Sequence, residues 1–308
     1  MGHVTFVHSM GNKPPVEILP DMWQRALRTE QGVDLAGRGV TTSMVYWADV
    51  VYNLALTNPL EYESTSEDTG LEPVEPVSMA WERGLDLPEK RWVAALGARL
   101  GVAIGVEEGA QIMQSPIEKR LERIPLPWPV KRRFMRTLVR DVHHYLFDSP
   151  SSPRPGRTYR VRSEVHQRMQ AELLEGSRKR GPHIVVSHGM GTVIAYDCLK
   201  RGRGPAVDAL VTIGSPLGID EVQGGLTPEW TRQDGFPHER VRGAWVNVYD
   251  PLDPVTGPDP SLAGDFRRAG QEAVEDIEEP SSGLWRHNIS KYLRGAKLRA
   301  RLSSLLGW

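Results

Sequence analysis

One stretch, residues 181–199 with the sequence GPHIVVSHGMGTVIAYDCL, most constrains what this chain can fold into. Its apolar run at residues 184–186 is short and β-branched, which is typical of a strand buried in a parallel sheet. From Met190 onward, apolar residues such as Val193 and Leu199 recur at helical spacing. The stretch therefore predicts a strand, a sharp turn and a helix in immediate succession.

Further strands and helices are expected at intervals along the chain. The expected strands are residues 3–8, 41–47, 207–213 and 244–249, and the last of these is the last clear strand. Helices are expected at residues 21–28 and 160–175 and, as a basic terminal helix, after residue 293. The proline- and serine-rich residues 149–156 are interpreted as a linker. Strands that alternate with helices predict the α/β class, with a mostly parallel, doubly wound sheet.

Composition restricts the kinds of partner and compartment. The 308 residues include 38 basic and 39 acidic residues, so no overall field favours nucleic acid or an anionic membrane. Cys198 is the only cysteine, which excludes an intramolecular disulfide and fits a reducing compartment. The first residues lack the features of a secretory signal, and no apolar run is long enough to span a bilayer. We therefore expect a cytoplasmic protein without membrane insertion.

Residues 181–199 resemble the nucleophile elbow of the α/β-hydrolase superfamily, which includes serine esterases and lipases. In that elbow a serine lies at the centre of a small-x-Ser-x-Gly turn between a strand and a helix. Residues 187–191, SHGMG, fill the five positions, so Gly189 stands where the nucleophilic serine is expected. The sequence TIGSPLG at residues 212–218 adds a second, moderate point of likeness.

The resemblance implies a single α/β-hydrolase domain over residues 1–308 that lacks the first strands of the family's sheet. It also implies that residues 60–150 are a helical cap inserted between the second strand and the elbow strand. Within that insertion, residues 62–76 are expected to form a surface loop and residues 78–147 to be mostly helical, with a proline-rich break at 124–130. The alternative is that these helices only cover one edge of the sheet.

The superfamily's order of catalytic residues is nucleophile, then acid after a late strand, then histidine near the C-terminus. Asp253 follows the strand at residues 244–249 by a short turn and is the expected acid, with Asp250 as its competitor. His287 is the only histidine after both, so it is the expected base. In such a triad the carboxylate orients the imidazole, which takes a proton from the attacking group.

Two tetrapeptides suggest where the nucleophile lies. The oxyanion loop of related esterases runs His-Gly, whereas residues 8–11 read HSMG; the elbow residues 188–191 read HGMG where serine is expected. Because the oxyanion strand and the elbow strand are neighbours in the superfamily, Ser9 can replace the missing serine while backbone N–H groups still stabilise an oxyanion. The candidate oxyanion or binding residues are Met10, Met190, His8 and His188.

Alternatives remain open on the sequence alone. Gly189 can instead mark an inactivated hydrolase that binds a ligand or partner, and Ser9 can be a small turn residue without a role. His8, His188 and His287 can also converge to activate water or transfer a proton. For the enzyme, we expect a small, mainly apolar ester, thioester or lactone as substrate, with hydrolysis or acyl transfer, no cofactor and no metal. His143 and His144 are interpreted as solvent-facing or capping residues, and the oligomeric state stays open.

Overall fold

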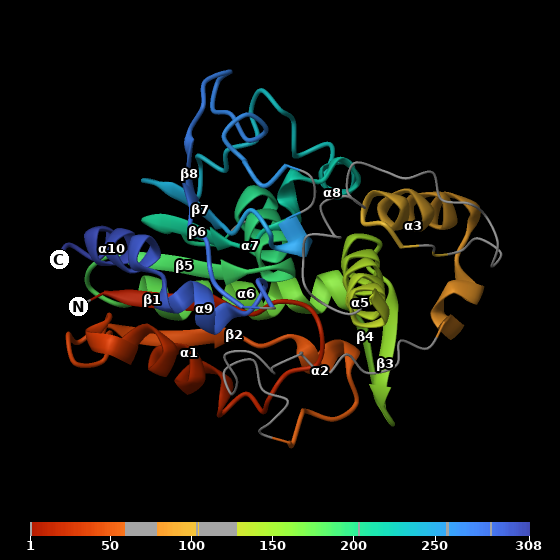
Figure 1. Cartoon of the computed structure of the whole chain (residues 1–308), viewed down its shortest axis with the longest axis horizontal. Helices are drawn as coiled ribbons and strands as arrows, with labels where there is room; N and C mark the ends of the chain where they lie inside the picture. The colour runs from red at the N-terminus through yellow and green to blue at the C-terminus, as the bar shows by residue number, and fades with distance from the viewer. Residues whose placement is uncertain are drawn as a thin grey trace.

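A computed structural model describes residues 2–58, 79–102, 104, 128–202, 204–256, 259–283 and 285–308. At its centre is a six-stranded sheet with the order β2-β1-β5-β6-β7-β8 (Figure 1). Its strands are β1 His3–Val7, β2 Thr41–Val45, β5 His183–His188, β6 Ala209–Ile213, β7 Trp245–Tyr249 and β8 Val274–Glu278. Every neighbouring pair is parallel, which confirms the predicted α/β class.

Helices cover both faces of this sheet because the strand side chains alternate between two apolar cores. Val185 points into a core shared with α5 (Trp128–Leu146), α6 (Val161–Ser177) and α7 (Met190–Arg201). Ile184 and Val186 point into the other core, shared with α1 (Leu19–Arg28), α9 (Ile289–Arg294) and α10 (Ala296–Leu305). A strand buried on both faces reads as an apolar run, which is why the sequence showed the central strands clearly.

Strand β8 was missed by the sequence analysis, which ended the strands at residue 249. Its sequence is VEDIE, and only Val274 among its residues is buried. An edge strand has only one neighbouring strand, and this one carries charges that oppose pairing with other chains. Its periodicity was therefore hidden by its polar composition.

The insertion between β2 and β5 is partly described. It contains a short 3-10 helix, η3 Met79–Gly84, followed by α3 Leu87–Arg99 and by α5. Helix α3 packs against α5 and against α8 (Asp220–Gly225). Figure 1 places α3 and α5 on the side of the sheet where the strands end. The loop expected at residues 62–76 lies outside the described residues.

Two boundaries in this region differ from the expectation. Helix α5 begins at Trp128, inside the stretch expected to be a break. Residues 149–156 are not a linker, because β3 (Pro150–Arg154) and β4 (Arg157–Arg160) pair as an antiparallel hairpin. Prolines are tolerated in edge strands, and each strand of a two-stranded sheet has a free edge. Composition alone therefore gave the wrong structure here.

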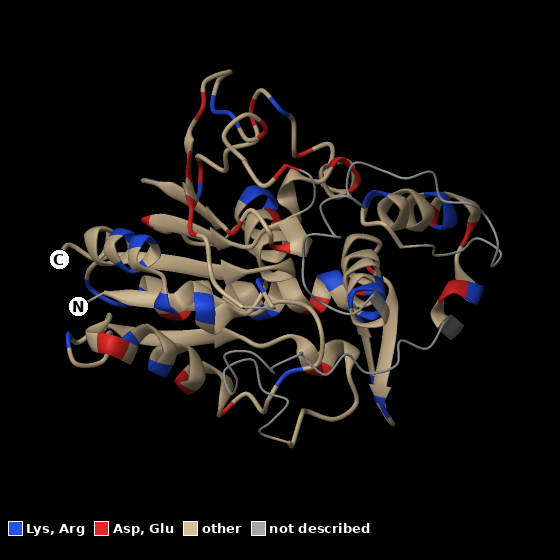
Figure 2. Cartoon of the chain, in the orientation of Figure 1, with Lys and Arg blue, Asp and Glu red and all other residues tan. Residues whose placement is uncertain are grey.

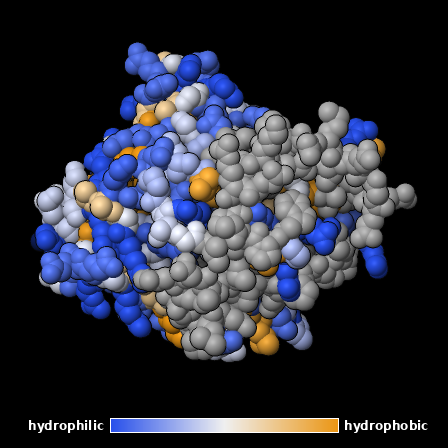
Figure 3. Space-filling view, viewed as in Figure 1, coloured by the Kyte–Doolittle hydropathy of each residue, from blue (hydrophilic) through white to orange (hydrophobic). Residues whose placement is uncertain are grey.

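The described surface carries charges of both signs. Figure 2 shows Lys and Arg interspersed with Asp and Glu on most helices and connecting segments. On the face shown in Figure 3, the coloured residues are mostly hydrophilic, with apolar residues scattered among them. A search of the described residues finds no helix with the length and apolar character needed to cross a membrane.

Candidate active site

Two turns meet at the carboxyl ends of neighbouring strands. β1 pairs with β5 so that Val7 lies opposite Ser187. We call residues 8–11, after β1, the serine turn, and residues 188–191, at the end of β5, the glycine turn. The two turns therefore lie side by side, and they bring Ser9 next to Gly189.

The backbone of Gly189 has the geometry of a sharp strand-to-helix turn. Its φ is 50° and its ψ is −123°, and it forms the N-cap of α7. Its N–H donates to the carbonyl of Ile213 at 2.9 Å, which fixes the turn against β6. A Cβ atom placed on Gly189 would lie 2.0 Å from Ser9 Oγ and 2.7 Å from His287 Nε2. The hydroxyl of Ser9 thus occupies the volume that a side chain at position 189 would need.

Ser9, His287 and Asp253 form a continuous chain of hydrogen bonds. Ser9 Oγ lies 3.2 Å from His287 Nε2, and His287 Nδ1 lies 2.9 Å from Asp253 Oδ2. A carboxylate accepts hydrogen bonds, so His287 Nδ1 carries the proton and Nε2 is free to accept from the serine hydroxyl. Ser9 and His287 are fully buried and Asp253 nearly so. A hydroxyl, an imidazole and a carboxylate linked in this order can act as nucleophile, base and orienting acid.

Asp253 rather than Asp250 contacts the histidine. The Asp250 carboxylate accepts from the backbone N–H and the hydroxyl of Ser281 at 2.7 and 2.8 Å. Although the two aspartates lie three positions apart in the sequence, Asp250 binds Ser281 and Asp253 binds His287.

The Asp253 carboxylate is held in place by further donors. Its Oδ1 accepts from the N–H of Val255 at 2.8 Å, and its Oδ2 accepts from the hydroxyl of Tyr292 at 2.8 Å. Burial raises the pKa of Tyr292 well above its usual value, and the nearby Asp253 charge raises it further, so the phenol remains a donor. Gly214 has a φ of 54°, and a Cβ there would lie 2.6 Å from Asp253 Oδ2. A side chain at position 214 would displace the acid.

Aromatic rings enclose His287 on two sides. The ring of His188 stacks on that of His287 with centroids 4.3 Å apart and an interplanar angle of 23°. Burial, followed by the proximity of His287, lowers the pKa of His188 well below its usual value. The ring of Phe134, from α5, meets the ring of His287 edge-on, with the ring centroids 5.6 Å apart. The same Phe134 ring packs edge-on against the indole of Trp285, with the centroids 4.4 Å apart. His287 therefore lies between a neutral imidazole and an apolar wall.

His8 is placed beside the serine turn, with both of its ring nitrogens engaged by backbone groups. Its Nε2 accepts from the N–H of Trp47 at 2.9 Å, so its Nδ1 carries the proton and donates to the carbonyl of Ser9 at 2.8 Å. Its ring stacks on Trp47 at 4.9 Å. Burial lowers the pKa of His8 to about 3, with a smaller contribution from Lys13. This imidazole is neutral and holds the backbone that carries Ser9.

The two turns also contain two backbone amides, those of Met10 and Met190. Met190 is the first residue of α7, and Met10 follows Ser9 directly. Neither amide N–H has an acceptor among the described residues. A helix N-terminus carries unpaired N–H groups and a partial positive charge, which suits an oxyanion.

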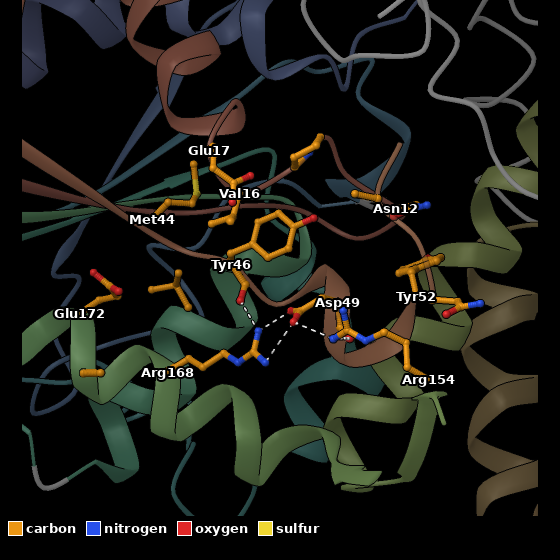
Figure 4. Close-up of a pocket in the computed structure, with 15 residues that line it drawn as sticks. Asn12, Val16, Glu17, Met44, Tyr46, Asp49, Tyr52, Arg154, Arg168 and Glu172 are labelled. Carbon is orange, nitrogen blue, oxygen red and sulfur yellow. Dashed lines mark hydrogen bonds and ion pairs between the residues drawn. The ribbon is translucent and has the colours of Figure 1, made fainter. Parts of the chain in front are cut away.

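The structure also contains a cavity away from these residues. It has a volume of about 500 Å³ and lies between the segment after β1, strand β2 and helix α6 (Figure 4). Inside it, Arg154 and Arg168 both bind the carboxylate of Asp49. Neither Ser9 nor His287 lines this cavity. Its two guanidinium groups are therefore already neutralised in part, and it is a separate feature of the fold.

Other polar candidates are structural. A search of the described residues finds no group of three or more His, Cys, Asp or Glu that could hold a metal ion. The expectation that His143 faces solvent is wrong, because its side chain is buried. The centroid of its ring lies 5.3 Å from that of Trp81 and 4.7 Å from that of Phe147. Helix α5 turns this position toward α3 rather than outward. Cys198 is buried in α7.

The sequence analysis missed three residues around the triad. Phe134 lies on a helix far from the motifs, and Tyr292 lies on the short helix that follows His287, but no local pattern distinguished either residue. Gly214 stood within the TIGSPLG sequence, so a signal was present, but its contact with the acid could not be read from it.

The parallel sheet flanked by helices defines an α/β protein, and the buried Ser9, His287 and Asp253 chain lies at the carboxyl edge of that sheet. Comparison of the chain with protein-family models, curated proteins and solved structures gives no match. Function therefore has to be argued from the site itself.

Proposed function

We propose that the chain is a member of the α/β-hydrolase superfamily that acts on acyl bonds with a nucleophile moved to Ser9. One observation carries the proposal: Ser9 Oγ lies 3.2 Å from His287 Nε2 and fills the space of a side chain at Gly189. The β1 and β5 adjacency supports the match to the oxyanion and elbow strands. Helices α3 and α5 of the insertion take the place of a cap.

The first step forms an acyl-enzyme. His287 Nε2 takes the proton of Ser9 as Oγ attacks the acyl carbon, and Asp253 stabilises the imidazolium that forms. The carbonyl oxygen gains negative charge in the tetrahedral intermediate, where the N–H groups of Met10 and Met190 donate to it. The bond to the leaving group then breaks, and His287 gives its proton to the departing oxygen or sulfur.

The second step releases the acyl group. A water or another acceptor gives its proton to His287 and attacks the acyl carbon. The bond to Ser9 Oγ then breaks, and the same proton returns to Oγ. Hydrolysis and acyl transfer differ only in the acceptor, and both restore the starting enzyme.

The surroundings favour a small, mainly apolar ester, thioester or lactone. Phe134 and Trp285 form an apolar wall beside His287. Apolar surface removed from water contributes roughly 25 cal/mol per Å² to binding an apolar group. Because Ser9 is fully buried, substrate can reach it only after residues around it move. Excluding water on closure would strengthen the electrostatic interactions of the site. A single cysteine, Cys198, excludes an intramolecular disulfide and fits a reducing compartment, so we place this activity in the cytoplasm.

A second candidate is a hydrolase fold that has lost activity and binds a ligand or partner. The full burial of Ser9 and His287 favours it, because a buried serine is closed to substrate until the fold opens. This candidate predicts ligand affinity that is unchanged when His287 is replaced, with no turnover in either form.

The test is labelling with a fluorophosphonate, followed by peptide mass spectrometry of the wild type, Ser9→Ala and His287→Ala. The proposal expects an adduct on Ser9 that both substitutions abolish. His166→Ala is the control, since His166 is likewise a histidine bound to an aspartate, Asp197, but is only partly buried and lies in α6. An unlabelled wild type, with folding intact, would support the binding protein instead.

A further inference from the structure

The serine turn lies outside regular secondary structure, yet three consecutive peptide groups of it are each held by a side chain. The indole N–H of Trp47 donates to the carbonyl of His8 at 3.0 Å. His8 Nδ1 donates to the carbonyl of Ser9 at 2.8 Å. The N–H of Gly11 donates to Asp141 Oδ2 at 2.9 Å. The orientation of each peptide plane from residue 8 to residue 11 is therefore fixed.

Asp141 differs from the other two holders because it is charged and comes from the insertion. It lies on α5 and is fully buried. Its Oδ2 also accepts from the hydroxyl of Tyr52 at 2.9 Å, and its Oδ1 accepts from the Arg140 guanidinium at 2.7 Å. A carboxylate accepts an amide N–H more strongly than a neutral group does. Helix α5 thus binds directly to the turn that carries the serine.

We propose that Asp141 is a positioning residue for the nucleophile. This inference rests on the proposed function, since it concerns the same serine. By holding the N–H of Gly11, Asp141 fixes the peptide plane between Met10 and Gly11, and His8 fixes the plane between Ser9 and Met10. In a trans peptide the C=O and N–H point in opposite directions, so a Ser9 carbonyl held by His8 directs the Met10 N–H away from His8.

Two consequences follow for the chemistry. Ser9 Oγ stays within hydrogen-bond reach of His287 without reorganisation, and the Met10 N–H has one defined direction. Preorganised donors and a fixed near-attack geometry are what lower the barrier in acyl transfer. Because Asp141 lies on α5, the same helix that contributes Phe134 to the wall beside His287 also sets the position of the serine.

A buried carboxylate can also be important only for stability, so the test needs a matched control. Asp197 on α7 is similarly buried, accepts from the hydroxyl of Tyr145 at 2.9 Å and pairs with Arg162 at 2.6 Å. It has the same types of partner as Asp141 but makes no contact with the serine turn. A loss of stability alone would appear in Asp197→Ala as well.

The first measurement is the rate at which a fluorophosphonate labels the full chain, as a function of the concentration of the probe. It gives the maximal labelling rate and the probe concentration at half of that rate. A displacement of about 1 Å at a reacting group can lower a rate by roughly 100-fold. We expect Asp141→Ala to lower the maximal rate 10- to 100-fold with little change in half-saturation. Asp141→Asn keeps an oxygen for the Gly11 N–H and should recover most of the rate, and Asp197→Ala should retain it. A wild-type maximal rate in folded Asp141→Ala would overturn the inference.

The second measurement does not depend on reactivity. The ¹⁵N resonance of His287 Nε2, identified by its loss in His287→Gln, reports its hydrogen bond to Ser9. We expect Asp141→Ala to shift it in the direction seen for Ser9→Ala, and Asp197→Ala to leave it unchanged. An unchanged resonance in Asp141→Ala would overturn the positioning role even if the wild type is unreactive, which separates this failure from that of the proposed function. If Asp141→Ala does not fold, Asp141→Ser replaces it, because its side chain is too short to reach Gly11.

Discussion

Substitution of Gly189 by alanine is expected to slow the reaction of Ser9 with a fluorophosphonate. A Cβ at position 189 would lie 2.0 Å from Ser9 Oγ, whereas real Cβ atoms keep at least 3.0 Å from other heavy atoms. The hydroxyl must therefore move by 3.0 − 2.0, or at least 1.0 Å, and the easiest movement rotates it away from His287. A displacement of that size lowers a catalytic rate by about 100-fold. Gly189→Ala should thus reduce the labelling rate of Ser9 to about a hundredth.

The same substitution has a cost in stability. The backbone of Gly189 has a φ of 50° and a ψ of −123°, which residues with a side chain rarely adopt. Strained backbone of this kind costs on the order of 1–3 kcal/mol. The midpoint of urea unfolding should therefore fall for Gly189→Ala, and the labelling rates have to be compared at temperatures where both proteins are folded.

A double substitution separates the volume argument from general damage. Ser9→Gly combined with Gly189→Ser removes the hydroxyl that lies in the way and places another at the end of the glycine turn. Its Cβ would still lie 2.7 Å from His287 Nε2, so the ring must shift by a few tenths of an ångström. We expect an adduct at position 189 in the double variant and a weaker adduct, or none, in Gly189→Ser alone.

Peptide mass spectrometry after fluorophosphonate labelling distinguishes the outcomes. Labelling of Ser9 in Gly189→Ala at the rate of the wild-type protein would refute the claim that the two positions compete for one volume. Labelling of position 189 in the single Gly189→Ser variant, with an unreactive wild type, would show that the chain is an inactivated hydrolase.

Three further predictions use other parts of the structure. Burial lowers the pKa of His8 to about 3 and that of His183 to about 4, both from 6.5. Their contribution to stability is present above pH 6.5 and is lost as the pH falls toward these values, because only the unfolded chain binds the protons. Below pH 6.5 each of these two histidines lowers the free energy of unfolding by about 1.4 kcal/mol per pH unit. Urea unfolding should therefore show a lower free energy of unfolding at pH 5.5 than at pH 7.5, and equal values would contradict the lowered pKa of these histidines. Tyr292→Phe removes a hydrogen bond to Asp253 and should slow Ser9 labelling several-fold while destabilising the fold by about 1 kcal/mol; an unaffected labelling rate would mean that the phenol does not orient the acid. Burial raises the pKa of the Cys198 thiol, so a disulfide reagent should react with it only after unfolding, and rapid reaction in the native state would show that α7 opens.

The fold was predictable from the sequence where burial made the pattern strong. Strands β5 and β6 lie inside the sheet and consist of β-branched and apolar residues, so their class and position followed directly. Strand β8 and the β3–β4 hairpin are exposed, and their charged or proline-bearing sequences lack the alternation that identifies a strand. The other edge strand, β2, was predicted because its last residues, Met44 and Val45, are apolar and buried, whereas packing selects few residues of β8 and of the hairpin.

The candidate site was predictable only in part, for a similar reason. Ser9 and Gly189 could be identified because the similar tetrapeptides HSMG and HGMG follow two strands that were expected to be neighbours. Asp253 and His287 followed from their order in the chain. Asp141 and Tyr292 could not be found, because their roles depend on which face of a helix meets a turn that is distant in sequence.

Under the proposed function, the exchange of serine and glycine between the two turns leaves the rest of the site unchanged. Moving the hydroxyl from position 189 to Ser9 changes which Cα carries the acyl group, but it leaves His287 and Asp253 in place. The N–H groups of Met10 and Met190 are backbone donors, so they do not depend on which turn carries the serine. The β1 and β5 strands that orient both turns are bonded directly to each other. A change from serine to glycine in the elbow would by itself leave an empty space beside His287, whereas here that space holds Ser9 Oγ. This complementarity favours relocation of the nucleophile over its simple loss, because loss alone gives no reason for a serine to fill the same volume.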